Sequence, residues 1–187
     1  MILFIDACVR SQSRTIRLAR RLLSRLDGDV VELRLHEIAF PVADEAFLDK
    51  RDRLIAASDY DDPLFGLARQ FAAADQIVIT APYWDLSFPA ALKQYFEQIN
   101  ALGVTFVYTP EGFPKGLCRA RKLYYVTTAG GEYVPEEFGF GYVKGLAQGY
   151  YGIPEVKQIK AVGLDIDGAD AEGILRDAME EVKKMDL

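Results

Sequence analysis

The strongest constraint on this chain is a regular alternation between short apolar runs and segments of helical periodicity. Apolar runs predict strands at residues 1–6, 30–33, 76–80, 122–128 and 156–162, most of them buried on both faces, and residues 105–108 fit one strand of a hairpin. Helical spacing predicts helices at 13–26, 45–57, 64–74, 89–102, 138–151 and 169–185. This order predicts an α/β fold, a parallel sheet covered on both faces, in one domain over residues 1–187.

Composition and charge exclude several kinds of partner. Asp and Glu outnumber Lys and Arg by 28 to 22, and an acidic surface repels phosphate backbones, so no nucleic acid partner is expected. No apolar run is long enough to span a bilayer and the first residues do not resemble a signal peptide, so no membrane insertion is expected. Two distant cysteines, Cys8 and Cys118, favour a cytoplasmic protein without disulfides. The single histidine, His36, leaves little room for histidine-centred catalysis or a zinc cluster.

Ligands of open parallel sheets bind at the carboxyl ends of the strands, so three segments are candidates: residues 7–15, 81–88 and 128–133. The first carries hydroxyls at Ser11, Ser13 and Thr15 where a helix begins, with Arg10 or Arg14 available to add charge. Free N–H groups, a helix N-terminus and hydroxyl donors suit a phosphate. Simple helix capping by Ser11 or Ser13 explains the same residues without a ligand.

A second chemistry fits the first segment. Cys8 and Arg14 have the Cys-x5-Arg spacing, which resembles the signature of the low-molecular-weight tyrosine phosphatases, and Asp62-Pro63 is similar to their general-acid pair. A thiolate at a helix N-terminus can act as a phosphatase nucleophile. The alternative is that Cys8 is a small buried residue in a strand-to-helix turn.

The other two strand ends suit a planar ligand. Pro82 turns the chain before Tyr83, Trp84 and Leu86, whose flat or apolar faces suit a heterocycle such as flavin, unless these aromatics fold into the core. In the third segment, Gly130-Gly131 lets the backbone approach a ligand edge, or forms a plain turn. Most of the 22 aromatic residues lie between 83 and 151, which favours a pocket wall, a dimer interface or both.

Three stretches carry a family resemblance: Ala81-Pro82-x6-Pro89-Ala90-x-Leu92-Lys93, then Tyr95-Phe96, then Gly103–Thr109. They resemble the flavodoxin-like NAD(P)H oxidoreductases, and most of all the FMN-dependent NADH-azoreductase and quinone reductase group. The resemblance runs from Met1 to about Leu164 and is most specific over residues 80–131. It implies a flavodoxin-like doubly wound five-stranded sheet of order 2-1-3-4-5 and a homodimer with one FMN per active site at the subunit interface.

The resemblance also implies a set of FMN contacts. Ser11, Gln12 and Ser13 match the phosphate-binding Ser-Gln-Ser of the family. The ring contacts correspond to Pro82, Tyr83, Trp84, Asp85 and Leu86, and the contacts at the pyrimidine rim to Thr128, Ala129, Gly130, Gly131 and Tyr133. Two positions differ from the family. Ala129 stands where the family has Arg, and Asp85 replaces an amide, so an anion near the ring should disfavour the reduced flavin.

The activity implied by the resemblance is hydride transfer from NADH or NADPH through FMN to a quinone, an azo compound or a nitroaromatic. Flavin carries the chemistry, so no catalytic side chain and no metal is expected. Two alternatives belong to other classes: a cysteine phosphatase that uses Cys8 and Arg14, and a flavodoxin-type electron carrier that docks redox proteins through an acidic surface.

Overall fold

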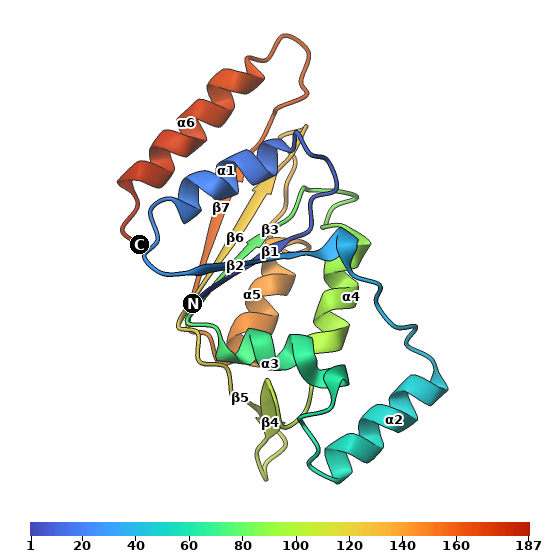
Figure 1. Cartoon of the computed structure of the whole chain (residues 1–187). Helices are drawn as coiled ribbons and strands as arrows, with labels where there is room; N and C mark the ends of the chain where they lie inside the picture. The colour runs from blue at the N-terminus through green and yellow to red at the C-terminus, as the bar shows by residue number, and fades with distance from the viewer.

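A computed structural model describes residues 1–187 and contains a five-stranded parallel sheet in the order β2-β1-β3-β6-β7 (Figure 1). Strands β4 and β5 form a separate hairpin. When the five strands of the main sheet are numbered alone, their order is 2-1-3-4-5, so the predicted order is confirmed. The strands lie close to the apolar runs of the sequence: β1 (Ile2–Asp6), β2 (Val30–Arg34), β3 (Gln76–Thr80), β6 (Lys122–Thr128) and β7 (Glu155–Ala161).

Helices cover both faces of the sheet (Figure 1). On one side α1 (Arg14–Leu23) and α6 (Ala171–Lys184) enclose a core of 13 buried residues. On the other side α3 (Gly66–Ala73), α4 (Ala90–Ile99) and α5 (Phe140–Gly149) enclose 24. Tyr124 and Tyr125 of β6 are both buried, one in each core, because neighbouring residues of a strand point to opposite faces.

The long connection from β2 to β3 lies outside this sandwich. It contains η1 (Leu35–Glu37), α2 (Glu45–Ala56) and η2 (Pro63–Phe65), and α2 projects from the body at the lower right of Figure 1. Asp44 caps α2, since its carboxylate accepts a hydrogen bond from the Phe47 N–H at 2.9 Å, but no residue of α2 is buried.

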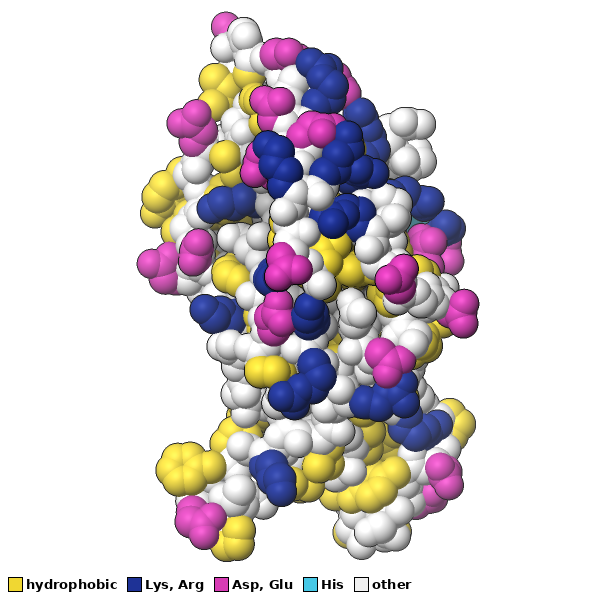
Figure 2. All heavy atoms as spheres, turned by 90° about the vertical axis from the view of Figure 1, so that its left-hand side faces the viewer, with side chains coloured by type: hydrophobic (Ala, Val, Ile, Leu, Met, Phe, Trp, Pro, Cys, Tyr) yellow, Lys and Arg dark blue, Asp and Glu magenta, His cyan; other side chains and the backbone are white.

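The predicted hairpin strand is also present. β4 (Phe106–Tyr108) pairs with β5 (Pro114–Gly116) at the end of the molecule opposite the carboxyl ends of the sheet strands (Figure 1). Three aromatic or aliphatic side chains of this region are exposed, namely Tyr108, Phe113 and Leu117. Figure 2 shows hydrophobic side chains gathered at this lower end of the molecule.

Two expectations differ in detail from the structure. β2 alternates between exposed and half-buried residues instead of being covered on both faces, because it is an edge strand paired only with β1. The last two helices on the larger core side are shorter than predicted: α4 starts after Pro89, which stands at its N-cap position, and α5 starts after Gly139. None of the helices has both the length and the apolar character needed to cross a membrane.

Two arginines attach α6 to the first helix: Arg17 within α1, and Arg25 just after it. Arg17 donates two hydrogen bonds to the Glu172 carboxylate, at 2.8 and 2.7 Å, and Arg25 donates to the Met185 carbonyl at 2.9 Å. Figure 2 shows the result as interleaved basic and acidic side chains over the upper half of the molecule. The acidic residues Glu180 and Glu181 pair instead with lysines of their own helix, three residues further along the chain.

Candidate functional site

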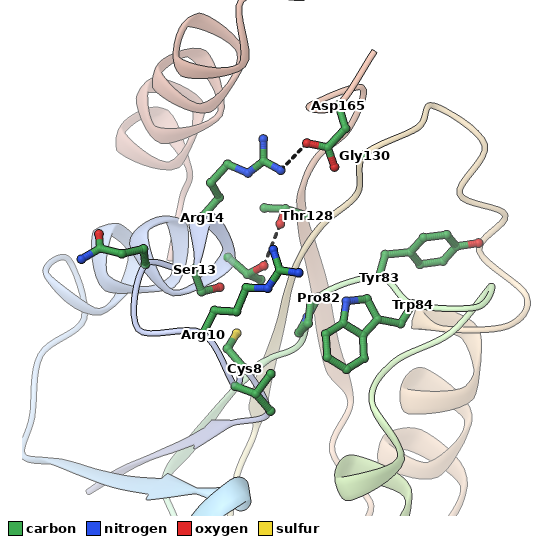
Figure 3. Close-up of a pocket in the computed structure, with 13 residues that line it drawn as sticks. Cys8, Arg10, Ser13, Arg14, Pro82, Tyr83, Trp84, Thr128, Gly130 and Asp165 are labelled. Atoms are coloured by element: carbon green, nitrogen blue, oxygen red, sulfur yellow. Dashed lines mark hydrogen bonds and ion pairs between the residues drawn. The ribbon is translucent and has the colours of Figure 1, made fainter. Parts of the chain in front are cut away.

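Hydrogen bonds that continue past the strands bring the three predicted strand ends together. The Tyr83 N–H donates to the Thr128 carbonyl at 3.0 Å, and the Ala129 N–H donates to the Ala161 carbonyl at 3.0 Å. The hydroxyls of Thr15 and Thr128 lie 2.7 Å apart, which attaches the first turn of α1 to the end of β6. The segments enclose a hollow of about 240 Å³ at the carboxyl edge of the sheet (Figure 3).

This hollow gathers about half of the predicted contacts. Its lining contains Gln12, Ser13, Pro82, Tyr83, Trp84, Thr128 and Gly130. It also contains Arg10, Arg14 and Thr15, which the first segment offered to a phosphate, and Cys8 of the phosphatase alternative. Only Val9 and Asp165 were not predicted in any role. Asp165 lies outside the three segments that the sequence analysis selected. It follows β7, the fifth strand of the sheet, whose carboxyl end reaches the same edge of the sheet.

The other predicted contacts lie around this hollow. Ser11 lines a neighbouring hollow of about 420 Å³ on the β2 side of the first loop, which shares Gln12 and Ser13 with the first. Asp85 and Leu86 face a third hollow, beside Phe138. Ala129 is buried, whereas Gly131 and Tyr133 are exposed, and none of these three lines a hollow described here. For these six residues, contact with a ligand stays a prediction.

The first loop has the donors that a phosphate needs. The backbone N–H groups of residues 9–12 donate no hydrogen bond within the protein. Ser13 is the N-cap of α1, and its hydroxyl oxygen accepts from the Ile16 N–H at 3.4 Å. The predicted cap is therefore real, but it leaves the hydroxyl hydrogen free to donate. Free N–H groups beside a helix N-terminus form an anion site.

Two arginines add positive charge to the hollow. Arg10 and Arg14 both line it, and Figure 3 shows the Arg10 side chain extending toward Trp84. No ion pair holds the Arg10 guanidinium, whereas Arg14 bonds to Asp165 at 2.6 Å and to the Leu164 carbonyl at 3.0 Å.

Trp84 supplies the flat wall of the hollow. It is 42% exposed, and Figure 3 shows its indole on the side of the first loop, whereas the Tyr83 ring points away from that loop. A tight turn fixes this arrangement, because Trp84 and Ser87 exchange two backbone hydrogen bonds, at 3.2 and 2.7 Å. The residues between them, Asp85 and Leu86, have φ of 51° and 66°. This left-handed backbone conformation is rare for residues other than glycine.

The environment of Cys8 contradicts the phosphatase alternative. Cys8 is buried in the strand-to-helix turn, and burial raises the pKa of its thiol to about 12, so the thiolate is scarce at neutral pH. Asp62 caps η2 by accepting a hydrogen bond from the Leu64 N–H at 2.8 Å, and this bond lowers the pKa of its carboxyl group. A general acid needs the opposite shift. The structure favours the interpretation of Cys8 as a packing residue.

We expect native Cys8 to resist alkylation by iodoacetamide at pH 9, where the unfolded thiol, of ordinary pKa 9.0, is half ionised. Because the folded-state pKa is raised, the stability from the protonated thiol is fully present below pH 9 and is lost as the pH rises through about 12. Mass spectrometry of native and urea-unfolded protein measures the difference. Rapid native labelling of Cys8 at pH 7, or p-nitrophenyl phosphate hydrolysis that disappears in Cys8→Ser, would restore the phosphatase alternative.

Comparisons with known proteins agree with this geometry. The family model described as the flavodoxin-like fold matches residues 1–185. The FMN-dependent NADH:quinone oxidoreductase of Coprothermobacter proteolyticus is 32% identical, over 98% of this chain and 96% of its own. The enzyme of the same name from Lachnoclostridium phytofermentans is 45% identical over 61% of this chain, and that match spans 58% of its own length.

A solved structure has the same fold along nearly the whole chain. The azoreductase from Bacillus anthracis superposes with a TM-score of 0.84, at 26% identity, over 98% of this chain and 96% of its own. The topology, the full-length family match and the full-length relative agree. The chain belongs to the flavodoxin-like family that includes the FMN-dependent NADH:quinone oxidoreductases.

Proposed function

We propose that this protein binds FMN and transfers hydride from NADH or NADPH to a small-molecule electron acceptor, a quinone, an azo compound or a nitroaromatic. One observation carries the proposal: Val9, Arg10 and Gln12, whose backbone N–H groups are unpaired, and the exposed face of Trp84 line opposite sides of one hollow. A phosphate at one end and a flat aromatic system at the other match that arrangement. The names of the relatives in the comparisons support the choice of FMN and NADH.

The residues of the hollow fit FMN by kind as well as by position. The N–H groups of 9–12, the Ser13 hydroxyl and the arginines would hold the phosphate, and Pro82 and Trp84 would lie against the ring system. Gly130 has no side chain, and the Asp165 carboxylate occupies the space beside it at the rim of the hollow. Ser11, Asp85, Leu86, Ala129, Gly131 and Tyr133 complete the proposed set, as contacts made from outside the hollow.

The residues of the protein would act mainly by positioning FMN and the two substrates. Bound FMN supplies the chemistry, since its ring system accepts a hydride from a reduced nicotinamide and passes it to the acceptor. Trp84 and Pro82 would set the plane in which the substrate stacks, and the buried Thr15–Thr128 pair keeps the first and third strand ends in register beneath it. Both substrates would use the same open face in turn. Cys8, the one thiol in the lining, stays protonated because burial raises its pKa to about 12, so it supplies no base.

We further propose that the protein works as a homodimer. Large apolar side chains are exposed on the loops that follow β3 and β6, beside the hollow: Trp84, Leu86, Tyr133 and Phe138. Clustered exposed aromatics are typical of interfaces, and a second copy would cover them and close the site from water. Sedimentation of the full chain checks this, and a monomer at micromolar concentration would contradict it.

Two further proposals concern the chain as a whole. We propose one domain over residues 1–187, because the sheet takes strands from residue 2 to residue 161 and α6 packs back onto α1. A single cooperative unfolding transition is the expected result. We also propose a cytoplasmic location, on the two free cysteines, and isolation from cells with both thiols reduced would agree.

The decisive experiment is a spectrum followed by an assay. We expect purified protein to carry, or to take up, FMN with its yellow absorption, and to oxidise NADH only when a quinone is present. Protein that binds no flavin would refute the proposal. Protein that binds flavin but reduces no quinone or azo dye with either nicotinamide would be an electron carrier instead.

A further inference from the structure

An ion pair spans the hollow between two elements that are far apart in the sequence. Arg14 is the first residue of α1, and Asp165 follows β7. The Arg14 guanidinium donates to the Asp165 carboxylate at 2.6 Å and to the Leu164 carbonyl at 3.0 Å, and both side chains line the hollow (Figure 3). The pair therefore joins the phosphate end of the hollow, at the start of α1, to its rim at Gly130.

Backbone contacts hold Asp165 in this place. Its N–H donates to the Gly130 carbonyl at 2.9 Å, and the Leu164 N–H donates to the Ala129 carbonyl at 3.2 Å. The carboxylate lies directly against Gly130: a Cβ at that position would be 2.5 Å from the Asp165 Oδ2. Glycine is needed here because of this close approach, and neither Gly130 nor Gly131 has a positive φ.

The ion pair is accessible to a competing anion. The Arg14 side chain is 32% exposed and that of Asp165 is 65% exposed, so solvent weakens their attraction. A guanidinium carries five N–H donors in a fixed fork, and the pair with Asp165 and Leu164 uses two of them. The remaining donors belong to the same hollow as the unpaired N–H groups of Val9, Arg10 and Gln12, and they are available to a phosphate that enters it.

From this geometry we infer that Arg14 makes the site selective for the phosphorylated flavin over riboflavin, and that Asp165 weakens this selectivity by engaging Arg14 and placing a negative charge beside the phosphate. The inference rests on the proposed function, since it concerns how FMN is bound. Arg14 acts on the phosphate directly. Asp165 is a positioning residue for Arg14, and its own negative charge acts on the phosphate as well.

The expected effects follow from the charges. Replacing Arg14 by Gln removes the cation and should weaken FMN binding about tenfold or more, because a charged hydrogen bond to a phosphate is lost. Arg14→Lys should recover part of that loss. Asp165→Asn keeps an oxygen that can accept from Arg14 and removes the negative charge, so it should tighten FMN binding roughly two- to fivefold, within the effect of an exposed ion pair. Riboflavin binding should change less than about twofold in all three variants, since riboflavin has no phosphate.

The chain contains a matched control one helical turn away. Arg17 and Glu172 form a similar ion pair between α1 and α6, with side chains 46% and 56% exposed. Neither residue lines the hollow that contains Trp84. Glu172→Gln makes the same charge change as Asp165→Asn at a residue that lines neither hollow of the first loop, so it should leave the ratio of FMN to riboflavin affinity unchanged.

The experiment is equilibrium titration of the flavin-free full chain with FMN and with riboflavin, followed by flavin fluorescence, for wild type and the four variants. An Arg14→Gln variant that loses both ligands equally, or keeps the wild-type ratio, would overturn the role of Arg14. An Asp165→Asn variant with unchanged or weakened FMN affinity, or one matched by Glu172→Gln, would overturn the role of Asp165. If wild type binds neither flavin, the proposed function fails instead, so the two failures are distinguishable.

Discussion

The Trp84→Ala variant is expected to bind FMN about ten- to a hundredfold more weakly than wild type, because stacking of a planar base on an aromatic side chain contributes roughly 1–3 kcal/mol. Trp84 is the aromatic side chain whose ring lies beside the first loop, and its 42% exposure leaves a face available to a ligand. Titration of flavin-free protein with FMN measures the loss. Riboflavin should lose a similar factor, since the contact is with the ring and not with the phosphate.

Two variants make this result specific. Trp84→Phe keeps an aromatic face and should recover most of the affinity. Leu86→Ala removes an exposed apolar side chain from the same turn, but Leu86 lies outside the hollow with Trp84, so its effect should be smaller. If Leu86→Ala weakened FMN binding as strongly as Trp84→Ala, the integrity of the turn and not the indole face would be responsible.

The Gly116→Ala variant is expected to lose about 3 kcal/mol or more of unfolding free energy, the upper part of the range for overpacking in a close-packed protein. A Cβ at position 116 would lie 2.1 Å from the Tyr151 carbonyl carbon and 2.2 Å from the Gly152 nitrogen. These are backbone atoms that no side-chain rotation can move away. The hairpin strand β5 would have to separate from the segment after α5, and urea denaturation measures the cost.

Gly145 is the control for this prediction. It lies inside α5, and a Cβ there would meet nothing within 4 Å. Gly145→Ala should therefore stabilise the protein by about 1 kcal/mol, through helix propensity alone. Equal destabilisation by both substitutions would mean that general sensitivity to alanine, and not the close approach of β5, decides the outcome.

Local patterns were enough to predict the sheet and most of the helices. Ile2–Asp6 and Gln76–Thr80 are central strands whose side chains are nearly all buried, and such strands are mostly apolar, as the runs in the sequence indicated. β2 was harder to describe, because its pattern of alternating exposure comes from its place at the sheet edge, which depends on the whole chain.

The candidate site was predicted in part. Thr128 ends a strand, and Gln12, Ser13, Pro82 and Trp84 lie in the loops after strands. The rule that ligands bind at strand ends locates these loops without a structure. Asp165 was missed, since an aspartate in a polar loop carries no local signal and acquires its role only through Arg14, 151 positions away in the chain.

The sequence by itself determined the class of fold, the order of its elements and the loops where a ligand would bind, because hydrophobic periodicity and chain reversals are local properties. Only the tertiary structure decided which side chains face the hollow, that the Cys8 thiol is buried with a raised pKa, and that Asp165 meets Arg14. The physical reason is that burial, charge pairing and close approach depend on atoms brought together across the sheet, and sequence separation carries no information about such distances.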